Sequence, residues 1–95
     1  MNFLIVDNQV LFREALVLLL QGLVDDLKVA EAGSLEEALR IADGGSRFDA
    51  VLIEPLSPGM NGYEGIKALR SYLPDTPIIV ISANATAAHT DTGST

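Results

Sequence analysis

The sequence predicts a doubly wound α/β domain, in which helices cover both faces of a parallel sheet. Three short apolar runs are typical of strands buried on both faces: residues 3–6, 50–53 and 78–81. Helical segments separate these runs. Because such alternation of strand and helix favours right-handed crossovers, we expect a parallel sheet of about four strands with three helices.

Residues 28–32 complete the expected set of strands. Polar and apolar residues alternate there, as in a strand with one solvated face, so we place this strand at an edge of the sheet. The first helix is expected to begin near Asn8, since asparagine is a favoured N-cap. Its apolar residues lie nearly all round the helix, which predicts burial on more than one side. They are Val10, Leu11, Phe12, Ala15, Leu16, Val17, Leu18, Leu19, Leu20 and Leu23.

Capping signals define the second helix. Ser34 is a typical N-cap and Glu37 completes a capping box with it, while Gly44 and Gly45 end the helix. The residues that recur at helical spacing between these ends are Leu35, Ala38, Leu39 and Ala42.

The third helix is indicated by Asn61 and Glu64, a second expected capping box, and by Pro74, which cannot continue a helix. Its apolar stripe consists of Ile66, Leu69 and Leu73. Strand and helix therefore alternate throughout the chain.

Composition excludes several classes of function. The chain has 95 residues, a hydrophobic share of 48% and no cysteine, which fits one small domain and excludes disulfides, thiol catalysis and cysteine zinc sites. The one histidine, His89, cannot form a histidine metal cluster. A formal net charge of −7 argues against nucleic-acid binding by this segment, because no basic patch is available to displace phosphate counterions.

The chain is expected to divide into a domain over residues 1–84 and a flexible tail over residues 85–95. After Ala83 there is no large apolar residue, so the tail cannot supply a buried element. No apolar run approaches the roughly 20 residues that span a bilayer. We therefore expect no membrane segment and a cytoplasmic location.

Polar residues directly follow three of the expected strands. They are Asp7, Glu54 and Ser82. In doubly wound folds the ligand site lies at the carboxyl ends of the strands, near the switch in strand order, so these side chains are candidates for one site. Asn8 is a further candidate beside Asp7, with helix capping as its structural alternative. A serine at a strand end is also commonly a local hydrogen-bonding residue.

Four segments in order resemble the receiver domains of bacterial response regulators, which are CheY-like and have a flavodoxin-like fold. The resemblance covers about residues 2–84. Among receiver domains, the chain especially resembles those joined to helix-turn-helix output domains, which are of the LuxR/NarL type. The matching segments are residues 3–14, 31–34, 48–62 and 77–83.

The resemblance implies that Glu54 stands where the family has the aspartate that accepts a phosphoryl group from a histidine kinase. It also implies that Asp7 and Asn8 match two acidic residues that hold Mg²⁺, the second being the direct ligand, and that Ser82 matches a hydroxyl near the phosphate. Since Asn8 carries no charge, Mg²⁺ should bind only weakly, at Asp7 and Glu54, and we expect no resident cofactor.

Glu54 is one methylene longer than aspartate. In-line phosphoryl transfer depends on positioning, so this residue is a poor acceptor. Pro55 restricts Glu54 to extended conformations and removes a backbone donor beside it. Three interpretations stay open: Glu54 mimics the charge of a phosphorylated aspartate, the site is inert, or Glu54 is itself phosphorylated.

The resemblance further implies elements that this sequence lacks: a fourth helix, a fifth strand carrying a lysine that pairs with the phosphate, and a fifth helix. Lys28 and Lys67, the two lysines, stand elsewhere. We therefore expect a receiver truncated after the fourth strand, with residues 78–81 as an open edge and apolar surface uncovered. Self-association through the first helix or through this edge strand would cover that surface.

Together these inferences predict a degenerate receiver domain that is not an enzyme, is not phosphorylated in the ordinary way, and acts as a homodimerising signalling module. A sensor kinase or an output domain would be its other partner. The alternative is a genuine phosphoacceptor receiver of a phosphorelay, with its site at Glu54 or completed by missing or partner elements. A flavin-binding protein or small enzyme of similar topology is disfavoured, because residues 7–10 lack the glycines and hydroxyls that cradle phosphate groups.

Overall fold

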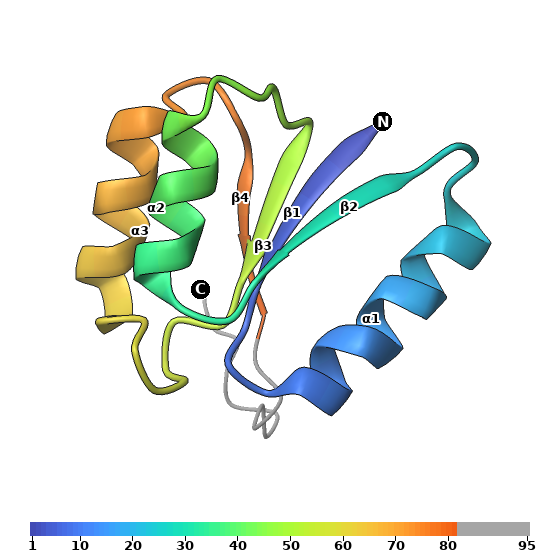
Figure 1. Cartoon of the computed structure of the whole chain (residues 1–95), viewed down its shortest axis with the longest axis horizontal. Helices are drawn as coiled ribbons and strands as arrows, with labels where there is room; N and C mark the ends of the chain where they lie inside the picture. The colour runs from blue at the N-terminus through green and yellow to red at the C-terminus, as the bar shows by residue number, and fades with distance from the viewer. Residues whose placement is uncertain (82–95) are drawn as a thin grey trace.

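The computed structural model describes residues 1–81, and these form a four-stranded parallel sheet with helices on both faces (Figure 1). The strands are β1 (Asn2–Val6), β2 (Lys28–Ala32), β3 (Ala50–Ile53) and β4 (Ile78–Val80), and the helices are α1 (Val10–Leu23), α2 (Leu35–Asp43) and α3 (Gly62–Tyr72). The strand order is β2-β1-β3-β4, and a helix connects each strand to the next. The predicted doubly wound, flavodoxin-like fold class is confirmed. Ser82 and the expected tail over residues 85–95 lie outside the described residues.

The two central strands are the most apolar part of the sheet. All four residues of β3 are buried, and the last three residues of β1 are completely so. β2 lies at one edge, with its first residue and Glu31 exposed, as its alternating sequence predicts. The continuous apolar runs therefore place β1 and β3 correctly at the centre.

β4 departs from the expectation that its apolar run is buried on both faces. Ile79 and Val80 are 47% and 50% exposed, and within residues 1–81 the strand pairs with β3 alone. Apolar sequence makes a segment suitable for burial, but the neighbouring elements determine whether burial occurs. In the described part of the chain β4 is an edge strand, which agrees with the expectation of an open edge at residues 78–81.

The two faces of the sheet are covered unequally (Figure 1). α2 and α3 pack on one face, where the buried cluster of the described residues has eleven members. On the other face α1 is the one described helix, and only Ile5, Ala50 and Leu52 are buried there. No residue of α1 is itself buried, so the prediction that α1 is buried on more than one side is wrong. The helix contacts the sheet along a single stripe that includes Leu16 and Leu20.

The ends of α2 follow the sequence closely. The Ser34 hydroxyl accepts a hydrogen bond from the Glu37 N–H at 3.1 Å, which confirms the predicted N-cap. The Glu37 carboxylate accepts in return from the Gly33 N–H at 2.7 Å, one residue before the position that a standard capping box uses. Gly44 is the C-cap.

The expected capping box at the start of α3 does not form. Asn61 is the N-cap, but its backbone is left-handed, with φ of 59°, and its side chain makes no capping hydrogen bond. A side-chain cap requires extended backbone at this position, which Asn61 lacks. The preceding loop instead packs tightly on the helix: a Cβ built on Gly65 would lie 2.1 Å from the Met60 carbonyl oxygen. Only glycine fits at position 65, and the loop after β3 is fixed against α3.

None of the helices within the described residues combines the length and the hydrophobicity that crossing a bilayer requires.

Candidate functional site

Asp7 and Glu54 lie at adjacent positions on the carboxyl edge of the sheet. β1 and β3 are parallel neighbours with Val6 opposite Ile53, and one acidic residue directly follows each of these partners. The Glu54 N–H donates to the Val6 carbonyl at 3.0 Å, and neighbouring strands lie about 4.8 Å apart. Asp7 is 0% exposed and Glu54 is 2% exposed. The fold therefore buries two acidic side chains next to each other.

The Asp7 carboxylate is only half satisfied. Its Oδ1 accepts from the Gln9 N–H at 2.9 Å, within the turn that leads into α1. Its Oδ2 is buried and has no hydrogen-bond partner among the residues that the structure describes. Because an unpaired buried polar atom costs free energy, the position of this oxygen requires an explanation. It is an acceptor that a cation or a proton donor could use.

Asn8 does not act as the cap of α1, which corrects the structural alternative given for it above. The N-cap is Gln9, and no side chain hydrogen-bonds there. The Asn8 Nδ2 instead donates to the Gly33 carbonyl at 3.4 Å, across to the loop after β2. The residue is exposed and offers a neutral amide beside the acidic pair.

The Glu54 side chain is folded back on its own loop. Its Oε2 accepts from the Leu56 N–H at 3.0 Å, while the buried Ser57 hydroxyl donates to the Glu54 carbonyl at 3.1 Å. The Gly62 N–H closes the loop on the Pro55 carbonyl at 3.0 Å. To attack a phosphoryl donor, a carboxylate oxygen of Glu54 would have to become accessible, because the residue is 2% exposed.

Asp7 and Glu54 are the two carboxylates at this edge that could contact Mg²⁺. Mg²⁺ requires near-octahedral oxygen coordination, usually with one or two carboxylates. Within residues 1–81 no group of three or more acidic, histidine or cysteine side chains is arranged to hold a metal ion. Asp7 has one unpartnered oxygen, but Glu54 Oε2 bonds to a backbone N–H and the Asn8 amide donates to Gly33. A weak interaction at Asp7 and Glu54 stays a prediction.

Arg13 is a cation of this sheet edge that the sequence reasoning missed. Its Nε lies 2.9 Å from Glu31 Oε1, its Nη1 donates to the Asp7 carbonyl, and its side chain is only 15% exposed. One signal could have revealed it. Arg13 falls at helical spacing with Leu16 and Leu20, on the stripe of α1 that faces the sheet, and a charge on such a stripe requires a nearby partner.

The two lysines lie away from the acidic pair. Lys28 begins β2, at the opposite end of the sheet from the carboxyl edge. Lys67 is exposed on α3 and pairs with Glu64 at 3.5 Å. Neither lysine is placed to form an ion pair with a charge on Glu54.

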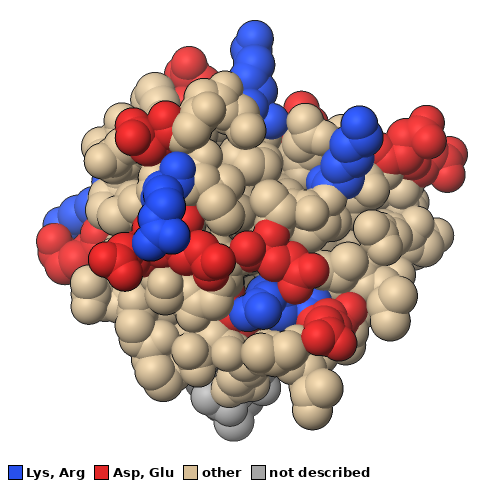
Figure 2. All heavy atoms as spheres, in the orientation of Figure 1, with Lys and Arg blue, Asp and Glu red and all other residues tan. Residues whose placement is uncertain are grey.

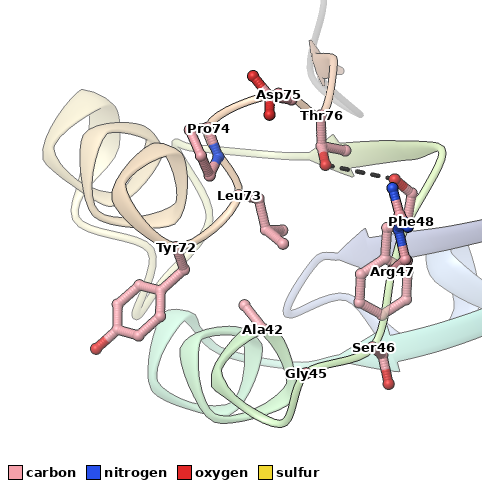
Figure 3. Close-up of a pocket in the computed structure, with 10 residues that line it drawn as sticks. All are labelled: Ala42, Gly45, Ser46, Arg47, Phe48, Tyr72, Leu73, Pro74, Asp75 and Thr76. Carbon is pink, nitrogen blue, oxygen red and sulfur yellow. Dashed lines mark hydrogen bonds between the residues drawn. The ribbon is translucent and has the colours of Figure 1, made fainter.

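A hollow of about 340 Å³ lies at the other end of the sheet, between the loop after α2 and the loop after α3 (Figure 3). Leu73 points into it, and the Thr76 hydroxyl joins the two loops by donating to the Phe48 carbonyl at 3.3 Å. None of the candidate residues of the carboxyl edge lines it. The hollow and the acidic pair are separate features.

A family model described as the response regulator receiver domain matches residues 3–93. The chain belongs to this family. The resemblance seen in the sequence is thereby confirmed, and the sheet of the receiver domain explains why its acidic residues meet at one edge. Receiver domains are signalling modules of two-component systems, and they interact with histidine kinases and output domains.

Three similar proteins illustrate the range of receiver proteins. The glycerol metabolism activator of Pseudomonas putida is 32% identical over 82 residues, which are 86% of this chain and 37% of that protein. This chain thus spans little more than a third of the length of that relative. A crystal structure of a Burkholderia pseudomallei response regulator, with a phosphorylated aspartic acid, calcium ion and citrate, has a TM-score of 0.77 at 26% identity and covers 92% of this chain and 49% of that one. A crystal structure of histidine kinase ThkA in complex with response regulator TrrA has a TM-score of 0.75 at 27% identity, and the match covers 95% of this chain and 75% of that one.

Proposed function

We propose that this receiver domain is an interaction module of two-component signalling that is not phosphorylated in the ordinary way and carries out no catalysis of its own. The observation that supports this most directly is the state of Glu54, which is 2% exposed and bonded to the Leu56 N–H. An acyl phosphate forms only when a carboxylate oxygen meets the donor phosphorus in line. A buried and longer side chain is poorly placed for that encounter.

Asn8 supports the same proposal, because it weakens the expected binding of Mg²⁺. Where the family has an acidic Mg²⁺ ligand, this chain has an amide that donates to the Gly33 carbonyl. Less negative charge means weaker attraction for a divalent cation and less neutralisation of the charge that develops on a phosphoryl group. Glu54 would then serve as a permanent negative charge at the acceptor position or as an inert member of the loop.

The test is incubation with a small-molecule phosphodonor, such as acetyl phosphate, and Mg²⁺, followed by intact mass spectrometry. We expect no phosphate adduct on the natural chain. The matched control is the double variant Asn8→Asp/Glu54→Asp, which restores both acidic positions of the family and is expected to gain a detectable adduct at residue 54. Fragment spectra locate any phosphate, since the chain also contains serine and threonine hydroxyls.

A high-occupancy adduct at Glu54 of the natural chain would overturn the proposal in favour of a genuine phosphoacceptor. One observation favours that alternative. Asp7 Oδ2 is buried without a partner among residues 1–81, as an oxygen kept for a cation would be. In this case Mg²⁺ would increase the yield of the adduct, and chelation would abolish it.

Homodimerisation is the second part of the proposal, and a sensor kinase or an output domain is the other partner that we propose. Support comes from apolar side chains that stay exposed on α1 and β4, including Leu11 at 82% and Val80 at 50%. Contiguous exposed apolar surface commonly marks an interaction site. The cytoplasmic location stays a prediction.

A further inference from the structure

α1 carries an apolar stripe on the side that faces away from the sheet. Leu11 and Leu18 are 82% and 73% exposed, and Leu19 is 59% exposed. They share one face of the helix because residues spaced by three, four, seven and eleven positions lie close together round its axis. We call this face the outer stripe: Leu11, Ala15, Leu18, Leu19 and Gly22.

The outer stripe contains no charged residue, although the chain carries a net charge of −7. The two charged side chains of α1 are Arg13, which pairs with Glu31 on the sheet side, and Glu14 on the flank. On the face seen in Figure 2, charged side chains form a band across the middle and upper part. Two copies that met through the outer stripe would approach without placing like charges directly against each other.

Four of the five residues of the outer stripe, two leucines and two small residues, are spaced in a self-complementary order. In a two-fold pair of antiparallel helices, position i of one copy lies opposite position j of the other, and j lies opposite i. Centring such a pair between Ala15 and Leu18 sets Leu11 against Gly22, and Leu18 against Ala15. Leu11 and Leu18 then each meet a small residue, which lets the helices approach closely, and Leu19 lies beside this row. A Cβ at Gly22 would meet nothing within 4 Å, so there is room beside it for an incoming leucine.

We propose that a second copy of this chain covers the outer stripe, with the two α1 helices packed antiparallel about a two-fold axis between positions 15 and 18. This deepens the proposed homodimerisation and rests on it. The stripe offers three exposed leucines and two small residues per copy, which is a small contact surface. Stable dimers bury about 800 Å² per partner, so the pair is a weak dimer that forms at high protein concentration.

The first experiment is sedimentation velocity over a hundredfold range of concentration, with circular dichroism on the same samples to verify folding. We expect a concentration-dependent dimer that Leu18→Glu weakens at least about tenfold, because it places two charges in the interface. Tyr63→Glu is the matched control. It adds the same charge at a 69% exposed aromatic residue on α3, across the sheet from α1, and should leave association unchanged.

Val80→Pro tests the competing geometry, which is pairing of β4 edges. Ile81 N–H bonds inward to the Ile53 carbonyl, so in a parallel ladder the Val80 N–H points outward. Proline at position 80 removes this outward donor and spares the bonds to β3. We expect the dimer to survive the change.

The second experiment determines the direction of the helices by disulfide trapping, which is simple because the chain has no cysteine. Ala15→Cys and Leu18→Cys variants are prepared separately, one of them with a mass tag, then mixed and oxidised. The antiparallel pair predicts mainly mixed 15–18 crosslinks. A parallel pair would give mainly 15–15 and 18–18 crosslinks, and that result would overturn the proposed geometry.

The outcomes separate this inference from the function on which it rests. If the folded natural chain dimerises but Leu18→Glu does so equally well, or if Val80→Pro abolishes the dimer, the outer stripe is not the interface while homodimerisation stands. If the folded chain stays monomeric at every concentration, both this inference and the homodimerising part of the proposed function are wrong. The phosphodonor experiment is unaffected by either result.

Discussion

Asp7 combines complete burial with a carboxylate oxygen that no described residue satisfies. Proteins usually pair such atoms, and they keep exceptions mainly at sites that serve function. Here the neighbour on the next strand is a second buried carboxylate, Glu54. The pair makes the carboxyl edge of the sheet a destabilising feature, retained in a domain that has little stability to spare.

Asp7→Asn should therefore stabilise the domain. The amide keeps an oxygen for the Gln9 N–H and replaces the unpartnered oxygen by a donor beside Glu54. We expect a gain of about 1 kcal/mol, which is a rise in Tm of roughly 4–8 °C. Thermal unfolding followed by circular dichroism measures it.

Asp49→Asn is the control for that change, because the Asp49 carboxylate already accepts from the Asn2 N–H at 2.7 Å. It should bring no stabilisation. A loss of stability on Asp7→Asn would contradict the account and would mean that the Asp7 carboxylate has a favourable partner, such as a bound cation.

At the scale of elements, the loop after β3 is held from two sides. Glu54 and Ser57 bond it to itself, and Gly65 allows the Met60 carbonyl to approach α3. Met60 is also fully buried in the core beneath α2 and α3. The loop that presents Glu54 is consequently anchored to α3 and to the core, which restricts movement of its carboxylate toward a donor.

Gly65→Ala should destabilise the domain by about 2 kcal/mol or more, because the new Cβ would lie 2.1 Å from a backbone oxygen that cannot move alone. Chemical denaturation with urea gives the free energy of unfolding. Gly22→Ala, measured at low concentration, is the control: its Cβ meets nothing within 4 Å in the last turn of α1, so no loss of stability is expected. Equal effects of the two changes would disprove the close contact.

At the scale of the whole molecule, the net charge of −7 opposes self-association while the uncharged outer stripe favours it. Salt screens the repulsion between two acidic copies, and the contact itself contains no ion pair to weaken. Raising the sodium chloride concentration should therefore strengthen the dimer, as sedimentation equilibrium would show. A dimer that dissociates in salt would indicate an interface built on charge pairs.

The sequence predicts the architecture better than it predicts the surroundings of each residue. Apolar runs locate β3 and β4 equally well, yet β3 is buried throughout and β4 is half exposed, since burial depends on which elements lie beside a strand. Asn61 occupies the expected N-cap of α3 but cannot cap it, because capping depends on a backbone angle that sequence does not reveal.

For the candidate site, strand-end position was sufficient to bring Asp7 and Glu54 to one edge of the sheet. Their hydrogen bonds could not be foreseen. The Glu54 carboxylate bonds within its own loop, and Arg13 arrives from a helix whose rotation about its axis is set by packing. The sheet topology determines where the site residues lie, whereas their hydrogen-bond partners depend on side-chain geometry.

The unequal cover of the sheet also has a consequence for the order in which the domain opens and closes. α2 and α3 share a cluster of eleven buried residues with the sheet, whereas α1 contributes none, so far less free energy holds α1 in place. The strands with α2 and α3 form the cooperative unit, and α1 can leave and rejoin it while that unit persists. The first helix of the chain would thus be the last to dock, after the strands and helices that follow it in sequence have assembled the surface it needs.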